Sequence, residues 1–170
     1  PGSMCPRCET PIAWHDNLPV IGWLKRRGRC ANCQAPISVQ YPLVEIASGL
    51  LAIAVLTLHG LTAASLFIYG ACLVLLALAV IDFRTQLLPD ILTLPLLWAG
   101  FLFQLFFHPF MLTNAVIGAM AGYLLLWSFY WLFKLITGKE GMGYGDFKLL
   151  AALGAWLGWS FLPLLLILAA

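Results

Sequence analysis

The chain has 170 residues, of which 62% are apolar and only 9% are charged, and its mean hydropathy is +0.95. A soluble domain is about half apolar and about one quarter charged, so this composition excludes an ordinary water-soluble protein and indicates several membrane spans. The formal net charge is only +2, so the useful information is where the charges lie along the chain.

The segment 1–42 differs from the rest of the chain, because it holds four of the five cysteines and five of the nine Lys and Arg residues. The apolar content is concentrated after about residue 43. We therefore predict a small polar domain over 1–42 and a membrane domain over 43–170. No basic segment followed by a short apolar stretch and a small-residue cleavage site opens the chain, so we expect no signal peptide.

Two C-x2-C pairs occur in the polar domain, Cys5 with Cys8 and Cys30 with Cys33. The interval between them, 9–29, is close to that of four-cysteine zinc ribbons, in which four thiolates bind zinc tetrahedrally. The metal would fold a segment that is too short to bury a core of its own. Disulfides are the alternative, but they are rare in the reducing cytoplasm, where the charge pattern below places this domain. Cys72 lies in an apolar span and is expected to be a small packing residue.

Apolar length predicts membrane-spanning helices over 43–58, 62–81, 91–107 and 111–136, and a further apolar helix from 146 through 158. The fold class is therefore predicted to be an all-α polytopic membrane protein with a small N-terminal zinc-ribbon-like domain. The last residues, 164–170, end within an apolar run that has no polar cap. We expect from this that the sequence is part of a longer protein.

The positions of the basic residues predict the orientation in the membrane. If each of the first four spans crosses once, the basic residues all fall on one side: those of the polar domain, Arg84, Lys134, Lys139 and Lys148. The positive-inside rule assigns this side to the cytoplasm. The basic cluster at 25–29 is expected to be solvated or to face anionic lipid headgroups, and we predict no nucleic-acid partner.

Two aspartates stand at predicted helix ends on this same face. Asp82 ends an apolar helix, where the helix dipole disfavours a negative charge, so a functional role is expected. Asp146 opens an apolar helix, and a helix N-cap is its alternative interpretation. Two close carboxylates share one proton, so that one acts as base toward water and the other as acid, which is aspartic-protease chemistry. The helix ends favour Asp82 as the protonated partner and Asp146 as the ionised one.

Residues beside the two aspartates are candidates for a supporting role. Gly141, Gly143 and Gly145 precede Asp146 and let the backbone adopt positive φ and approach a ligand or substrate strand closely. Asp90 follows a proline and suits a helix N-cap, with support of the site as the alternative. Lys148 is interpreted as a positive-inside anchor or, alternatively, as a residue that fixes the carboxylate charge.

Taken together, the motifs resemble those of bacterial prepilin peptidases, the type IV leader peptidases of pilus and type II secretion systems, which are GxGD-type membrane aspartic proteases. The resemblance covers nearly the whole chain and runs through the two C-x2-C pairs, Asn17-Leu18-Pro19, Tyr41-Pro42-x-x-Glu45, Ile81-Asp82, Leu88-Pro89-Asp90 and Gly143-Tyr144-Gly145-Asp146-Phe147-Lys148. The first membrane helix and the final helices of full-length members are not present in this sequence.

The resemblance implies a multi-pass protease of the bacterial inner membrane. Its substrates would be prepilins or pseudopilins, cut on the cytoplasmic side just after a glycine, with removal of a short basic leader. Asp82 and Asp146 then match the two catalytic aspartates. Many members also methylate the new N-terminus with S-adenosyl-L-methionine, an activity associated with the cysteine domain, for which the sequence indicates no binding residues.

Two other classes of protein remain as alternatives. A transporter can use intramembrane aspartates with broken, glycine-rich helices, but it predicts acidic residues near the bilayer midplane and an inverted repeat. A membrane scaffold with a zinc-ribbon docking domain explains the cysteines but gives Asp82 and Asp146 no role.

Overall fold

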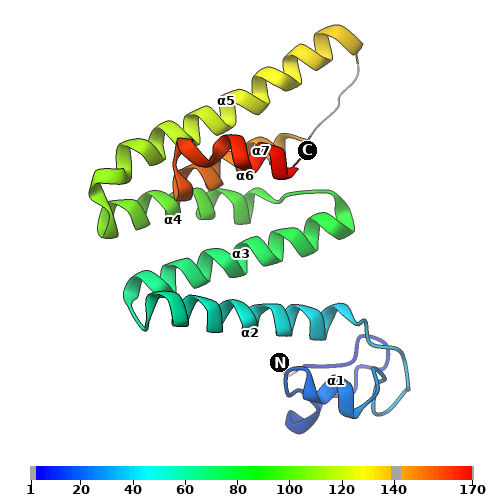
Figure 1. Cartoon of the computed structure of the whole chain (residues 1–170). Helices are drawn as coiled ribbons and strands as arrows, with labels where there is room; N and C mark the ends of the chain where they lie inside the picture. Colours follow the sequence, from blue (N-terminus) through cyan, green and yellow to red (C-terminus); the bar gives the residue numbers. More distant parts are fainter. Residues whose placement is uncertain (1–2, 139–142, 170) are drawn as a thin grey trace. The chain divides into compact units, whose positions relative to one another are not determined.

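The computed structural model describes residues 3–138 and 143–169, and within them it contains helices and no strand. The elements in chain order are η1 (Trp14–Asp16), α1 (Ile21–Lys25), α2 (Gln40–His59), α3 (Ala63–Thr85), α4 (Asp90–Phe107), η2 (Pro109–Met111), α5 (Leu112–Thr137), α6 (Tyr144–Leu157), η3 (Trp159–Phe161) and α7 (Leu162–Ala169). The predicted all-α fold is confirmed (Figure 1).

Four helical segments among the described residues are long and apolar enough to cross a membrane: Gln40–His59, Ala63–Thr85, Asp90–Phe107 and Pro109–Thr137. They coincide with the four predicted spans, which makes the chain a multi-pass membrane protein. The second of these helices continues beyond the predicted end at residue 81 and ends at Thr85. Asp82 therefore lies inside the last turn of α3 and not in the following loop.

The predicted apolar helix from residue 146 forms but is shorter than a membrane span. The 14 residues of α6 rise about 21 Å at 1.5 Å per residue, whereas the hydrocarbon core is about 30 Å thick. The helix ends at Gly158, whose φ of +79° is a conformation that favours glycine. A 3-10 turn and the short helix α7 follow.

Contacts between residues divide the chain into two compact units, Pro1–Leu58 and His59–Ala170. In the second unit α6 contacts both α5 and α4, and lies between them in Figure 1, while α3 contacts α4. The buried side chains of Leu78, Leu96 and Ala152 join α3, α4 and α6 in one core. The predicted boundary between a polar domain, 1–42, and a membrane domain, 43–170, is based on amino-acid composition and remains a prediction.

Small residues allow α5 and α6 to approach closely. A Cβ on Gly118 would lie 2.5 Å from the carbonyl oxygen of Gly154, which is shorter than any tolerated contact. Polar groups fasten α6 to α4, because Trp156 Nε1 donates a hydrogen bond to the Leu96 carbonyl at 2.9 Å. Gln104 Nε2 in turn donates to the Trp156 carbonyl at 2.8 Å. These contacts hold α6, which carries Asp146, in one register against its neighbours.

Candidate functional site

The four cysteines of the N-terminal unit lie on two loops with the same backbone pattern. In the first loop, Cys5 N–H donates to the Thr10 carbonyl at 3.1 Å and Glu9 N–H donates to the Cys5 carbonyl at 2.8 Å. The same two bonds recur in the second loop, where Cys30 N–H donates to Ala35 at 2.9 Å and Gln34 N–H donates to Cys30 at 3.2 Å. The two loops are therefore copies of one turn.

The sequence analysis missed this duplication, although the sequence carries a signal for it. Both loops read Cys-x-x-Cys, then Glu or Gln, then one residue, then Pro-Ile. Glu9 and Gln34 occupy equivalent positions and both have a positive φ, of 54° and 57°. The repeat places two cysteines of each loop at equivalent positions, so that the two copies supply two candidate ligands each.

The structure brings the four predicted ligands together. The Sγ atoms of Cys5, Cys8, Cys30 and Cys33 all lie within 4.8 Å of one another, and none of the four is in a disulfide. Cys5 Sγ is 3.8 Å from Cys33 Sγ, and Cys8 Sγ is 3.9 Å from Cys30 Sγ. A tetrahedron with Zn–S bonds of about 2.3 Å has S–S edges of about 3.8 Å. The cluster can bind a metal, and its spacing fits a tetrahedral ion.

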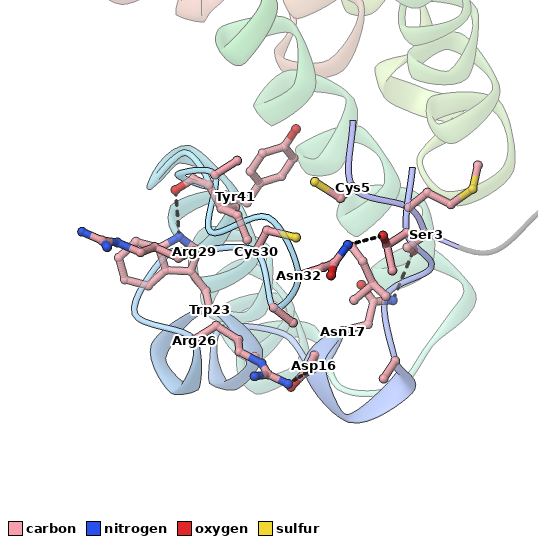
Figure 2. A pocket seen from close by; sticks show the side chains of 18 of the residues that line it. Ser3, Cys5, Asp16, Asn17, Trp23, Arg26, Arg29, Cys30, Asn32 and Tyr41 are labelled. Carbon is pink, nitrogen blue, oxygen red and sulfur yellow. Dashed lines mark hydrogen bonds and ion pairs between the residues drawn. The ribbon is translucent and has the colours of Figure 1, made fainter. Parts of the chain in front are cut away.

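A cavity of about 910 Å³ lies beside the cysteine cluster within the same unit. Figure 2 shows that Trp23, Asn17, Asn32 and Tyr41 contribute to its lining. Glu45 also lines it and accepts a hydrogen bond from the Val20 N–H at 2.6 Å. This bond ties the start of α2 to the segment that precedes α1.

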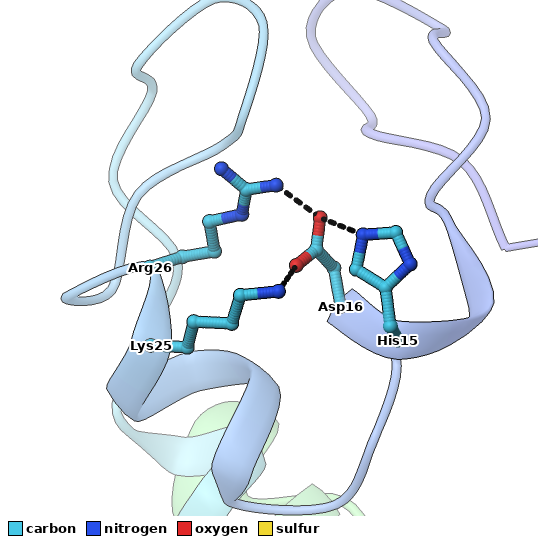
Figure 3. Close-up of polar contacts among 4 residues, drawn as sticks. All are labelled: His15, Asp16, Lys25 and Arg26. Carbon is cyan, nitrogen blue, oxygen red and sulfur yellow. Dashed lines mark hydrogen bonds and ion pairs between the residues drawn. The ribbon is translucent and has the colours of Figure 1, made fainter.

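A buried carboxylate organises the N-terminal unit. The Asp16 side chain is only 7% exposed and accepts hydrogen bonds from Arg26 and from Lys25 Nζ at 3.1 Å (Figure 3). The hydrogen bond from Arg26, with that from Lys25, lowers the pKa of Asp16 to about 2. Lys25 and Arg26 of the basic cluster thus pair with Asp16, although their side chains remain 51% and 37% exposed, and contact of the cluster with anionic lipid headgroups stays a prediction. The local sequence around Asp16 did not indicate this role, because its partners Lys25 and Arg26 lie 9 and 10 residues further along the chain.

The second candidate site is formed by Asp82 and Asp146, which lie on different helices. Asp82 is exposed in the last turn of α3, as predicted, and its carbonyl accepts the Gln86 N–H at 2.7 Å. Asp146 is half-buried as the third residue of α6, whose N-cap is Gly143. The N-cap interpretation of Asp146 is therefore wrong. A backbone hydrogen bond from Gly143 to the Asp146 carboxylate acts to lower its pKa.

The two carboxylates are close enough to influence each other. Burial raises the pKa of Asp146, which lies outside the four spanning segments, and the negative charge of Asp82 raises it further. The helix-end argument had made Asp146 the ionised partner. The structure favours Asp146 as the protonated one, because burial and the neighbouring charge outweigh the favourable helix N-terminus.

This coupling predicts a measurable response to removal of one charge. In an Asp82→Asn variant the pKa of Asp146 is expected to fall, because the charge that destabilises its ionised form is gone. A pH titration monitored by infrared spectroscopy should show that the band of the protonated Asp146 carboxyl group disappears at lower pH in this variant than in the wild type. An Asp146→Asn variant identifies that band, and an unchanged titration in Asp82→Asn would contradict the coupling.

The glycines before Asp146 do not use the conformational freedom that the sequence offers. Gly143 has a φ of −79°, and Gly145 is not among the positive-φ residues. Gly141 lies outside the described residues. Gly145 packs closely against the chain itself, since a Cβ there would lie 2.7 Å from the Leu88 Cβ, and the close approach of a ligand or substrate strand stays a prediction. Gly145 thus presses the start of α6 against the segment that follows α3.

A matched pair of variants tests the close contact. Gly145→Ala should lower activity and stability, because the new Cβ forces the segment around Leu88 to move and displaces Asp146 relative to Asp82. Overpacking of this kind costs about 1–3 kcal/mol. Gly70→Ala in α3 is the control, since a Cβ on Gly70 would meet no atom within 4 Å. Thermal unfolding in detergent and peptide cleavage would be measured for both, and equal effects would contradict the contact.

Asp90 in the first turn of α4 and Lys148 in the second turn of α6 form an ion pair. Lys148 Nζ donates to the two carboxylate oxygens of Asp90 at 2.7 and 2.6 Å. The N-cap of α4 is Pro89, and no side chain caps this end, so the predicted capping role of Asp90 is wrong. The alternative, support of the site, remains a prediction for Asp90, Gly143, Gly145 and Lys148.

The described structure therefore combines two features in a multi-pass helical membrane protein, a four-cysteine cluster suited to a metal and a pair of interacting aspartates. The model of the bacterial peptidase A24 N-terminal domain matches residues 1–59, and that of the type IV leader peptidase family matches residues 67–170. The chain belongs to the type IV leader peptidase family.

The similar relatives carry a two-part name. Prepilin leader peptidase/N-methyltransferase of Aeromonas hydrophila is 59% identical over all of this chain, which spans 59% of that relative. The protein of the same name from Klebsiella pneumoniae is 56% identical, and the chain spans 75% of it. The protein of that name from Pectobacterium carotovorum subsp. carotovorum is 54% identical, and the chain spans 61% of it. No solved structure matches the chain.

Proposed function

We propose that this protein is a membrane-embedded aspartic endopeptidase that removes the leader peptide of prepilins or pseudopilins. The observation that carries the proposal is the pair Asp82 and Asp146, which two separate helices bring close enough for one charge to act on the other. The names of the relatives supply the substrate class, because proteins 59% and 56% identical to this chain are named prepilin leader peptidases.

In the proposed reaction one proton is shared between the two carboxyl groups. Asp82, as carboxylate, takes a proton from a water molecule as the water oxygen attacks the carbonyl carbon of the scissile peptide bond. Asp146, as carboxylic acid, donates its proton to the carbonyl oxygen. Collapse of the tetrahedral intermediate breaks the C–N bond, and the amine leaves with a proton from the site. The raised pKa of Asp146 supports its role as the acid.

We place the cut after a glycine and on the cytoplasmic side of the bacterial inner membrane. The positive-inside rule supports this side, because Arg84 and Lys148 each lie two residues from one of the aspartates and Lys134 lies in the last turn of α5. Lys139, which belongs to the same group, lies outside the described residues. A basic leader would lie on this same side. The proposed partners are thus prepilin-like substrates and the lipid bilayer.

For the N-terminal unit we propose a structural zinc ion bound by the four cysteines. The sulfur spacing and the soft thiolate ligands suit zinc. Because the relatives are named N-methyltransferases, we also propose that the new N-terminus is methylated with S-adenosyl-L-methionine as donor. Residues 1–42 would form the cytoplasmic metal-binding domain and 43–170 the membrane protease domain.

The alternatives account for less of the structure. Both aspartates lie at helix ends, whereas a transporter places its ionisable residues near the middle of spans. A scaffold explains the cysteine cluster but gives no role to the Asp82 and Asp146 pair.

The direct test is incubation of the purified protein in detergent with a prepilin-type leader peptide, followed by mass spectrometry. The proposal expects one cut, after the glycine. Addition of S-adenosyl-L-methionine should then increase the mass of the fragment after the cut, which carries the new N-terminus, by one methyl group. Absence of any cut with folded protein would overturn the peptidase proposal, whereas a cut without methylation would overturn only the second activity.

A further inference from the structure

The Asp90–Lys148 ion pair holds the positive charge of a flexible side chain whose residue stands two positions after Asp146. Lys148 follows Asp146 by two positions on α6, and its ammonium group stands at the end of a four-carbon chain. In the structure both oxygens of Asp90 bind that ammonium, at 2.7 and 2.6 Å. The Lys148 side chain is 30% exposed, so it retains room to move.

A lysine released at this point would change the chemistry of the site. A positive charge within about 4–6 Å of a carboxylate lowers its pKa by about 1–3 units. Such a charge beside Asp82 and Asp146 would favour the state in which both are ionised, and the acid needed to protonate the carbonyl oxygen would be lost. The proposed reaction therefore requires that Lys148 be held elsewhere.

We propose that Asp90 is a positioning residue that holds the Lys148 ammonium away from the aspartate pair and so keeps the shared proton in the site. The inference rests on the proposed peptidase function and adds a role for a third carboxylate. The geometry suits this positioning role of Asp90. Asp90 begins α4 directly after Leu88-Pro89, and Leu88 contacts the start of α6 at Gly145. The ion pair therefore connects the same two segments as this contact.

The helices that contact α6 carry further titratable groups, which are Asp90 on α4 and Tyr123, Tyr130 and Lys134 on α5. Tyr144 and Lys148 lie on α6 itself, and Asp82, whose charge acts on Asp146, lies with Arg84 at the end of α3. Lys134 Nζ donates to the Tyr130 hydroxyl at 3.3 Å. A change at Asp90 alters the partner of Lys148 directly, whereas the remaining groups keep their charges. The effect can therefore be traced to Lys148 by a second substitution.

The test compares the pH dependence of kcat/KM in four proteins: wild type, Asp90→Asn, Lys148→Met and the double variant. In the high-pH limb of the pH profile, kcat/KM falls because the aspartate pair loses its shared proton. Asp90→Asn should move this limb to lower pH by about 1 unit, because the released ammonium stabilises the doubly ionised pair. The double variant should return the limb to the wild-type position or above it. Lys148→Met alone should not move it to lower pH.

Three results separate the possible explanations. A uniform loss of rate in Asp90→Asn with no displacement of the limb would overturn the inference and indicate a purely structural ion pair. Persistence of the displacement in the double variant would overturn it as well, because Lys148 would then not be its cause. Failure of the peptidase function itself looks different, since wild type would not cleave or Asp82→Asn would remain active. Helix content and thermal unfolding, measured in all four proteins, show whether they are folded.

Discussion

Substitution of either Asp82 or Asp146 by Asn is expected to abolish leader-peptide cleavage. Asparagine has nearly the same shape as aspartate but can neither take a proton from water nor donate one to a carbonyl oxygen. General acid–base groups contribute about 10²- to 10⁴-fold each, and loss of one member should stop the reaction in which both act together. Measurement of kcat/KM with a leader peptide at several pH values should show a loss of this size at every pH.

The control is a change beside Asp82 that leaves both carboxyl groups in place. Thr85 is exposed on the same helix end, and its hydroxyl donates to the carbonyl of Ile81 in its own helix, at 2.9 Å, so Thr85→Ala should cleave at nearly the wild-type rate. Metal content and helix content should be the same in all variants. If either Asn variant retained wild-type activity, that aspartate would be structural, and Asp90 would be the first candidate to replace it.

Loss of one cysteine from the cluster is expected to release the metal and unfold the loops around it. Structural zinc contributes about 10–16 kcal/mol in small four-ligand sites, which is more than the whole stability of most domains. A metal bound by the cluster would join the two loops directly, because each loop supplies two of the four cysteines. Cys5→Ser should therefore contain much less than one zinc per chain. Its segment 3–38 should also become sensitive to protease.

Cys72 provides the matched control for this experiment. It is a half-buried cysteine within α3 and belongs to the other compact unit, so Cys72→Ser removes a thiol without touching the cluster. Zinc measured by elemental analysis should remain at one per chain in this variant. Retention of full zinc content in Cys5→Ser, or equal losses in both variants, would refute the four-cysteine site.

Sequence patterns predicted the features that depend on local composition. Apolar length identified the four spans, and the C-x2-C spacing identified the candidate metal ligands. The position of Asp82 at a helix end also followed from the pattern, because a charged residue after an apolar run marks the end of a span. The residues of the candidate site on α6 were found because a glycine-rich turn precedes an apolar helix.

Apart from the duplicated cysteine loops, for which the sequence carries a signal, the features that were missed depend on residues far apart in the chain. Lys148 lies 58 residues after Asp90, so no local pattern shows that they pair and that Asp90 is therefore not a simple cap. The proton assignment was reversed for a similar reason. Burial of Asp146 arises from the packing of α6 against other helices, whereas the helix-end rule considers one helix at a time.

The length of α6 has a consequence for how the protein is made. A segment of 14 residues followed by a break at Gly158 is too short for the translocon to recognise as a span by itself. Its insertion should therefore depend on α4 and α5, which are synthesised earlier and offer the small residues and polar contacts that receive it. Damage to that interface, for example at Gly118, would then appear in cells as early degradation of the nascent protein and not as a slower enzyme.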